Sequence, residues 1–369
     1  MSIPKSFGKY KSIQIELLDY LEDQDESGNK RKFQNFLKLL DDNNIKSNKH
    51  EFRIILNLIE EVSSNHHRCP NFISKIKELL QTFQNDIKKS FTNIEIFDLF
   101  KGNRLILLFL IDQKILDLDL NIYFRMLKQN QLDQSFAKYF QNEFIQFSTK
   151  WKGKEEGNYE ENRRIGENES YICQLIRQDL LDEFDEYINK SNTSLKSSIK
   201  PSIYETNQFL IGKELTLIQY AAFYGSIKIF RYLLLNNVEL DKSLWLYAIH
   251  SNDAQLIHLL EENIKDVTNN DYKIFYKEAA KCHHNNIADY FMNNFLDNQN
   301  LYVGQLMKYC NFNLVNDDAN ISALFCFLYE NDILTSAEFL VNQSNANINQ
   351  IIILKKNLFL CSFIIQLFE

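Results

Sequence analysis

The feature of this 369-residue chain that most constrains its fold is a pattern that recurs in its C-terminal half. The clearest copy runs from Thr216 to Gly225 (TLIQYAAFYG), with apolar residues following at Ile229, Leu233 and Leu234. A hydroxyl that can cap a helix, a pair of alanines and a glycine at a turn predict two short antiparallel helices. Because one such pair cannot bury its own apolar face, several copies must stack on one another.

Other segments fit the same register. They are Ser243 to Asn252, Ile274 to His283, Ser322 to Asn331, and a weaker copy that starts at Ser170 and turns at Asp179. The longer intervals between copies contain insertions, and residues 189–212 form one of them. Upstream, the residues Gly102, Ile106, Leu110, Ile111 and Ile115 repeat the spacing of Gly225 to Val238, either as a further copy or by chance.

The composition also favours an all-α fold. Three prolines and nine glycines provide too few turn signals for many short strands. From Phe33 to Phe147 apolar residues recur at helical spacing, whereas glycines and charged residues fill the stretch from Lys150 to Ser170. We therefore predict a helical N-terminal domain (1–149), a charged linker (150–169), a repeat array (170–350) and an apolar C-terminal tail (351–369).

Charge and cysteine usage restrict the class of partner and the compartment. The 41 basic and 49 acidic residues give a net charge of −8 without a long basic block, which argues against nucleic acid as the main partner. Six scattered cysteines indicate a reducing compartment. The first ten residues contain no apolar signal region, and the apolar stretches are too short to span a membrane. We expect a cytoplasmic protein, with the nucleus as the alternative.

The segment from Thr216 to Leu240 resembles the ankyrin repeat, with Ala221, Ala222 and Gly225 at matching positions. Together with Asn65 to Arg68, Ile96 to Leu116, Arg163 to Cys173 and Tyr220 to Glu262, it is similar to the large, divergent, trichomonad-type ankyrin-repeat family of protists. The resemblance implies a helix-pair solenoid preceded by a helical region, and protein binding. The usual hairpin after the second helix is reduced to Asn236 to Leu240, so the β-hairpin fingers are expected to be short or missing.

The same resemblance implies which residues bind partners. Ankyrin-like stacks use the loops before each first helix and the two residues before each inter-helix turn, because these side chains leave the core. In this chain the two-residue positions are Phe223, Tyr224, His250, Ser251, Lys281, Cys282, Tyr329 and Glu330. Phe223 and Tyr224 are the expected anchors; alternatively, they pack beneath the insertion of residues 189–212. Trp245 aligns with a core position.

Two groups of metal-ligating residue types stand out. His66, His67 and Cys69 form one, and Cys282 to His284 form the other. Neither has the paired CxxC or HxxxH spacing of a strong zinc signature. We therefore interpret the histidines as solvated loop residues and expect no metal or cofactor.

The usual short signatures of enzymes are missing from the sequence. Lys101 to Arg104 lacks the second glycine and the strand context of a phosphate-binding loop, and no G-x-S-x-G, HExxH, GxGxxG or calcium-loop motif occurs. The carboxylates of 182–186 fall opposite an apolar helix face. We expect a non-enzymatic adaptor that binds proteins. The alternatives are a scaffold that self-associates through its C-terminal tail, and an enzyme without a recognisable motif.

Overall fold

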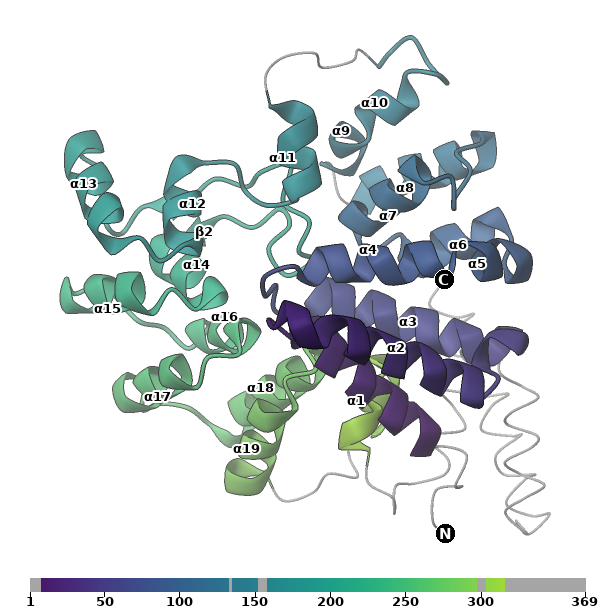
Figure 1. Ribbon diagram of the computed structural model, residues 1–369. Helices are drawn as coiled ribbons and strands as arrows, with labels where there is room; N and C mark the ends of the chain where they lie inside the picture. Colours follow the sequence, from purple (N-terminus) through teal and green to yellow (C-terminus); the bar gives the residue numbers. More distant parts are fainter. Residues whose placement is uncertain (1–7, 133–134, 152–157, 297–302, 316–369) are drawn as a thin grey trace, which may run out of the picture. The chain divides into compact units, whose positions relative to one another are not determined.

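The computed structural model describes residues 8–132, 135–151, 158–296 and 303–315 (Figure 1). It is 68% helical and 1% strand, which confirms the predicted all-α character. The chain divides into two compact units, residues 1–58 with 292–369 and residues 59–291. Along the sequence, α3 (Lys49–Asn65) and α19 (Asn285–Phe295) each contain a boundary between the units.

The first unit combines the N-terminal and the C-terminal parts of the described chain. Its remaining elements are α1 (Gly8–Glu22), α2 (Glu26–Asp42), the 3-10 turn η2 (Ile45–Ser47), α20 (Val303–Lys308) and the 3-10 turn η4 (Phe312–Leu314). Helix α1 packs against α2 and η4. The buried amide of Gln14 donates to Asn311 Oδ1 at 2.9 Å and accepts from the backbone of Asn313 at 3.0 Å. These bonds satisfy polar atoms that would otherwise be costly to bury.

The second unit contains most of the helices. They are α4 (Phe72–Thr82), α5 (Gln84–Ser90), α6 (Asn93–Phe100), α7 (Arg104–Asp112), α8 (Leu120–Leu132), α9 (Phe136–Tyr139), α10 (Gln141–Phe144), α11 (Tyr159–Ile165), α12 (Tyr171–Arg177), α13 (Leu181–Ser191), α14 (Leu217–Tyr224), α15 (Ile227–Leu235), α16 (Leu244–Ser251), α17 (Ala254–Asn263) and α18 (Asn269–Lys281). None of the helices in the described ranges combines the length and apolarity required to cross a membrane.

Helices α12 to α18 are organised as pairs whose first helices pack side by side. Helix α14 contacts α12 and α16, α16 also contacts α18, and each first helix packs on its own second helix, α13, α15 or α17 (Figure 1). Each of the four first helices is followed within two residues by a residue with left-handed backbone. These residues are Asp179, Gly225, Asn252 and His283, and their φ values lie between 51° and 67°. The sequence had placed turns at all four positions, and the structure confirms them.

Helix α14 shows how the repeated residues produce this geometry. The Thr216 hydroxyl accepts from the backbone N–H of Gln219, whose side chain accepts in return from the backbone N–H of Thr216. At the other end, Gly225 adopts φ 67° and the N–H of Ser226 donates to the carbonyl of Ala221 at 2.9 Å. Both helix ends are therefore satisfied by the residues of the repeat itself.

Neighbouring pairs also exchange hydrogen bonds. The carboxylate of Asp179, in the turn after α12, accepts from the backbone N–H groups of Lys228 and Ile229 at 3.1 and 3.0 Å. The Ser226 hydroxyl donates to the carbonyl of Ile176 at 2.5 Å. The first turn of α15 is thus capped by the preceding pair.

The upstream segment from Gly102 to Ile115, which repeats the spacing of Gly225 to Val238, forms only the second helix end of such a pair. Lys114 has φ 55°, and the N–H of Ile115 donates to the carbonyl of Leu110 at 2.8 Å. Asn237 and Val238 form the same end after α15, with φ 57° and a 3.1 Å bond to Leu233. The turn between α6 and α7 differs, because neither Lys101, with φ −58°, nor Gly102, which matches Gly225, adopts a positive φ. Helix α7 therefore ends like a repeat, whereas α6 does not.

The described end of the predicted linker, from residue 158 onwards, packs within the second unit. Its residues 158–165 include α11, and the Arg163 guanidinium is buried, with bonds to Glu143, Glu160 and the carbonyl of Tyr139. The division into units likewise does not follow the predicted boundary at 150–169. Composition suggested a linker because the segment is polar; in its described part, Arg163 instead makes a buried ion pair with Glu143. The copy at Ser322 to Asn331 and the tail 351–369 lie outside the described residues.

Candidate functional site

The predicted partner-binding residues are less exposed than expected. The exposed fractions of Phe223, His250 and Cys282 are 8%, 1% and 0%, so the expectation that these side chains leave the core was wrong. Tyr224, Ser251 and Lys281 are half-buried. Tyr329 and Glu330 lie outside the described residues. Trp245 is fully buried, as its alignment predicted.

The segment between α13 and α14 causes this burial. It begins and ends with an antiparallel pairing of β1 (Ser198–Ile199) with β2 (Leu215–Thr216). Between them, the Phe209 ring stacks on Phe223 with centroids 6.1 Å apart and lies 4.2 Å from the ring of His250. Lys213 Nζ lies over the Phe209 ring, 3.6 Å from its centroid. For Phe223, the alternative that it packs beneath the insertion is confirmed.

His250 links two further side chains beneath this cover. Its Nε2 lies 2.8 Å from Glu278 Oε1, and its Nδ1 lies 3.4 Å from Cys282 Sγ. An ionised carboxylate only accepts, so His250 donates from Nε2 to Glu278, and burial lowers the pKa of His250. Burial opposes ionisation of Glu278, but the bonds from His250 and Lys281 lower its pKa to about 2.

A cysteine, a histidine and an acid in this order also occur in enzymes with a cysteine nucleophile. Here Cys282 is fully buried, and burial raises the pKa of its thiol well above the usual value. A reactive cysteine needs the opposite, an accessible thiolate. We therefore interpret this group as a buried hydrogen-bonded network.

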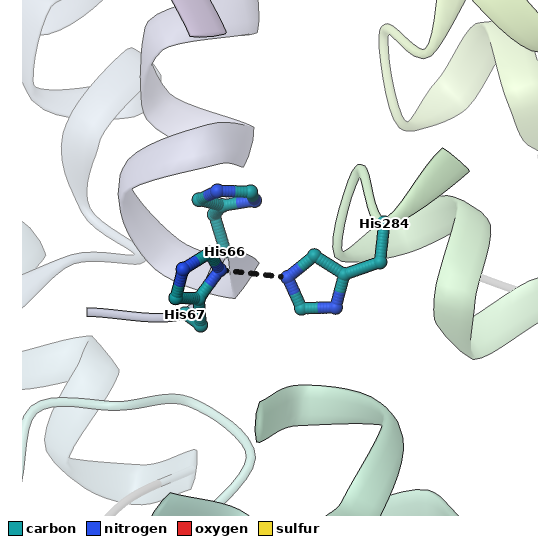
Figure 2. A group of neighbouring side chains, drawn as sticks. All are labelled: His66, His67 and His284. Carbon is teal, nitrogen blue, oxygen red and sulfur yellow. Dashed lines mark hydrogen bonds between the residues drawn. The ribbon is translucent and has the colours of Figure 1, made fainter. Parts of the chain in front are cut away.

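Three histidines from distant parts of the sequence meet in the second unit. His66 and His67 follow α3, and His284 lies in the turn before α19 (Figure 2). His67 Nδ1 lies 3.2 Å from His284 Nε2, and one ring nitrogen from each histidine lies within 4.8 Å of the others. His66 and His284 are 1% and 2% exposed, and His67 is half-buried. The interpretation of His66 and His283 as solvated loop residues was wrong, because their exposed fractions are 1% and 3%.

Two rings of this histidine cluster are oriented by backbone carbonyls. His66 Nδ1 lies 2.8 Å from the carbonyl oxygen of Cys282, and His284 Nδ1 lies 2.7 Å from that of Ile249. A carbonyl only accepts, so both rings carry a proton on Nδ1. Burial, together with His66 and His67, lowers the pKa of His284 well below its usual value. His284 Nε2 then accepts a hydrogen bond from Nδ1–H of His67, which Figure 2 draws as a dashed line.

The sequence contained both halves of the histidine cluster without showing that they meet. His66, His67 and Cys69 were one predicted group, and Cys282 to His284 the other. The structure takes two residues from the first and one from the second, and leaves out both cysteines. A search for ligand spacing within one segment could not have found this set.

A small pocket lies between α6 and α8. Its volume is about 290 Å³, and Phe97, Asp98, Lys101, Phe124 and Arg125 are among its lining residues. Asp98 pairs with Lys101 at 3.0 Å and with Arg125 at 3.5 Å, and all three side chains are about 42% exposed. The size is at the lower end for ligand sites, and the charges face one another at the surface. The pocket gives no support to the enzyme alternative.

Comparisons with known proteins leave the chain without an assigned family. No family model matches it, and neither the curated proteins nor the solved structures contain a significant match.

Proposed function

We propose that residues 170–296 form an ankyrin-like array of helix pairs that binds a protein partner and has no catalytic role of its own. The observation that carries this proposal is the side-by-side packing of α12, α14, α16 and α18, each of which is followed within two residues by a left-handed residue. In helix-pair solenoids, such a row of first helices forms an extended surface that partners use.

The binding surface we propose differs from the one expected from sequence. We define the loop face as Phe209, Lys213, Tyr224, Ser251 and Lys281, which are the exposed or half-buried residues around the covered Phe223 and His250. Phe209 supplies an aromatic surface, and aromatic side chains are enriched among the residues that dominate binding energy. The nearby ammonium groups of Lys213 and Lys281 favour an acidic segment of the partner.

The experiment compares partner capture by the full chain and by a loop-face variant. The Lys213→Glu, Lys281→Gln double variant changes the charge of the loop face, and it also removes the Lys213 contact with Phe209 and the Lys281 bond to Glu278. The control is Lys228→Glu with Lys265→Gln, the same changes at two exposed lysines away from the loop face. Each chain is used to capture proteins from its native lysate, and circular dichroism checks that it is folded.

Partners that bind the full chain and the control, but not the folded loop-face variant, would support the proposal. Equal capture by all three would place the binding elsewhere. If no chain captures a specific partner, the self-associating scaffold becomes the better hypothesis. Concentration-dependent oligomers in light scattering, abolished by deletion of residues 351–369, would then support it.

A further inference from the structure

The contact between His67 and His284 has the geometry of two ligands on one metal ion. Zinc binds histidine nitrogen at about 2.0–2.1 Å in tetrahedral sites, which places two ligand nitrogens about 3.3–3.4 Å apart. The observed separation of His67 Nδ1 and His284 Nε2 is 3.2 Å. The third ring, that of His66, has its centroid 4.4 Å from that of His67 and 4.8 Å from that of His284.

The surroundings of the histidine cluster match those of metal-bound histidines. Such histidines almost always donate their other ring N–H to a carbonyl or a carboxylate, which fixes the tautomer and the orientation of the ring. His66 and His284 both donate Nδ1–H to a backbone carbonyl, those of Cys282 and Ile249. These two bonds come from the main chain, so they hold the rings whether or not an ion is bound.

The donor set indicates which ion fits. Three imidazole nitrogens suit zinc and neighbouring divalent transition metals better than calcium or magnesium, which prefer oxygen ligands. His67 is the half-buried member of the cluster, so an ion can approach from its side. The second group, His250, Glu278 and Cys282, is less suitable because Lys281 already pairs with Glu278 at 3.3 Å.

We propose that His66, His67 and His284 bind one zinc ion through a ring nitrogen of each, with water as the fourth ligand. The ion links the segment that follows α3 to the turn that precedes α19. Its role is to cross-link two parts of the second unit that are separated by more than 200 residues of sequence. Three protein ligands leave one position that a water or a partner's side chain can occupy.

The test uses the full chain, stripped with a chelator and titrated with Zn²⁺ alone. Calorimetry should give one zinc per chain, and zinc should raise the melting temperature by about 5 °C at a hundredfold excess over Kd. His67→Gln should lower the zinc affinity at least about 100-fold and abolish the shift. His258→Gln, which changes an exposed histidine on α17, should behave like the wild type.

Two further measurements separate this site from the cysteine-containing group. Co²⁺ bound in place of zinc should show tetrahedral absorption bands without the sulfur-to-cobalt charge transfer that a cysteine ligand produces. Cys282→Ser should retain the wild-type affinity. The proposal is overturned if the wild type binds no zinc, if His67→Gln binds it as tightly as the wild type, or if Cys282→Ser loses it. Because the cobalt spectrum is recorded on the wild type, it decides between ligand sets even if a variant misfolds.

Discussion

The ring of Phe209 lies nearly parallel to that of Phe223, with a 9° angle between the planes. A residue of the insertion thereby covers the aromatic side chain that the sequence had assigned to the binding surface. The same ring also contacts Tyr247 and His250, so it packs on aromatic side chains of both α14 and α16.

Replacing Phe209 with alanine should destabilise the second unit by about 1–2 kcal/mol, because a half-buried ring loses part of the free energy of full burial. Urea unfolding followed by circular dichroism measures the change. Phe209→Leu, which retains apolar cover, should lose less than half as much. An unchanged urea midpoint for the alanine variant would mean that the Phe209 ring contributes no measurable free energy of unfolding.

Replacing Trp245 with alanine should destabilise the second unit more than the same change at Phe209. Trp245 is fully buried and stacks on Phe275 with centroids 5.2 Å apart and an angle of 17°. We expect Trp245→Ala to cost about 3–5 kcal/mol, with Trp245→Phe as the milder control. Equal effects of Trp245→Ala and Phe209→Ala on the unfolding midpoint would contradict the difference in burial.

Arg163 tests whether the supposed linker is structural. Its guanidinium is 2.6 Å from the carboxylate of Glu143, and their side chains are 4% and 12% exposed. Arg163→Met should cost about 3–5 kcal/mol, because it leaves a buried carboxylate without its charged partner. The exposed pair Lys190 and Glu186 provides the control, since Lys190→Met should change stability by less than about 0.5 kcal/mol. Similar losses in the two variants would show that 158–165 behaves as a flexible linker after all.

Gly225 tests the turn of the repeat. Its φ of 67° costs an L-residue about 1–2 kcal/mol, and an added Cβ would lie 3.3 Å from Cβ of Ser251. Gly225→Ala should therefore destabilise more than Gly212→Ala, where φ is 71° but the space is open. Gly225→Asn should lose less backbone energy, because asparagine tolerates left-handed backbone. Thermal unfolding ranks the three variants, and a larger loss at Gly212 would contradict the contact with Ser251.

Acid should selectively weaken the network around Glu278. Its pKa is about 2 in the folded chain against a usual value of 4.5, so the ionised carboxylate stabilises the fold above pH 4.5. That contribution is lost as the pH falls towards 2. Glu278→Gln should be less stable than the wild type by about 2–3 kcal/mol near pH 7 and nearly equal to it near pH 2. A difference that stays constant across this range in urea titrations would refute the assignment.

The sequence predicted the local parts of this fold well and its distant contacts poorly. Turns at Gly225 and Asn252 depend on residues within one helix pair, and the structure confirms them. The cover over Phe223 depends on how an insertion folds back, which its length does not specify. The meeting of His67 with His284 depends on packing across 217 positions, and no spacing rule within a segment reports it.

The bond between Asp179 and the start of α15 has a consequence for how the chain acquires its structure. The first N–H groups of α15 have their hydrogen-bond acceptor in the previous helix pair. Until that pair has folded, these groups lack this acceptor, and the start of α15 is less stable. During synthesis, α12 emerges before α15, so order can propagate in the direction of translation. In equilibrium, the same dependence joins adjacent pairs into one cooperative transition, and a fragment that begins at Thr216 would unfold with a smaller denaturant m-value and a frayed α15.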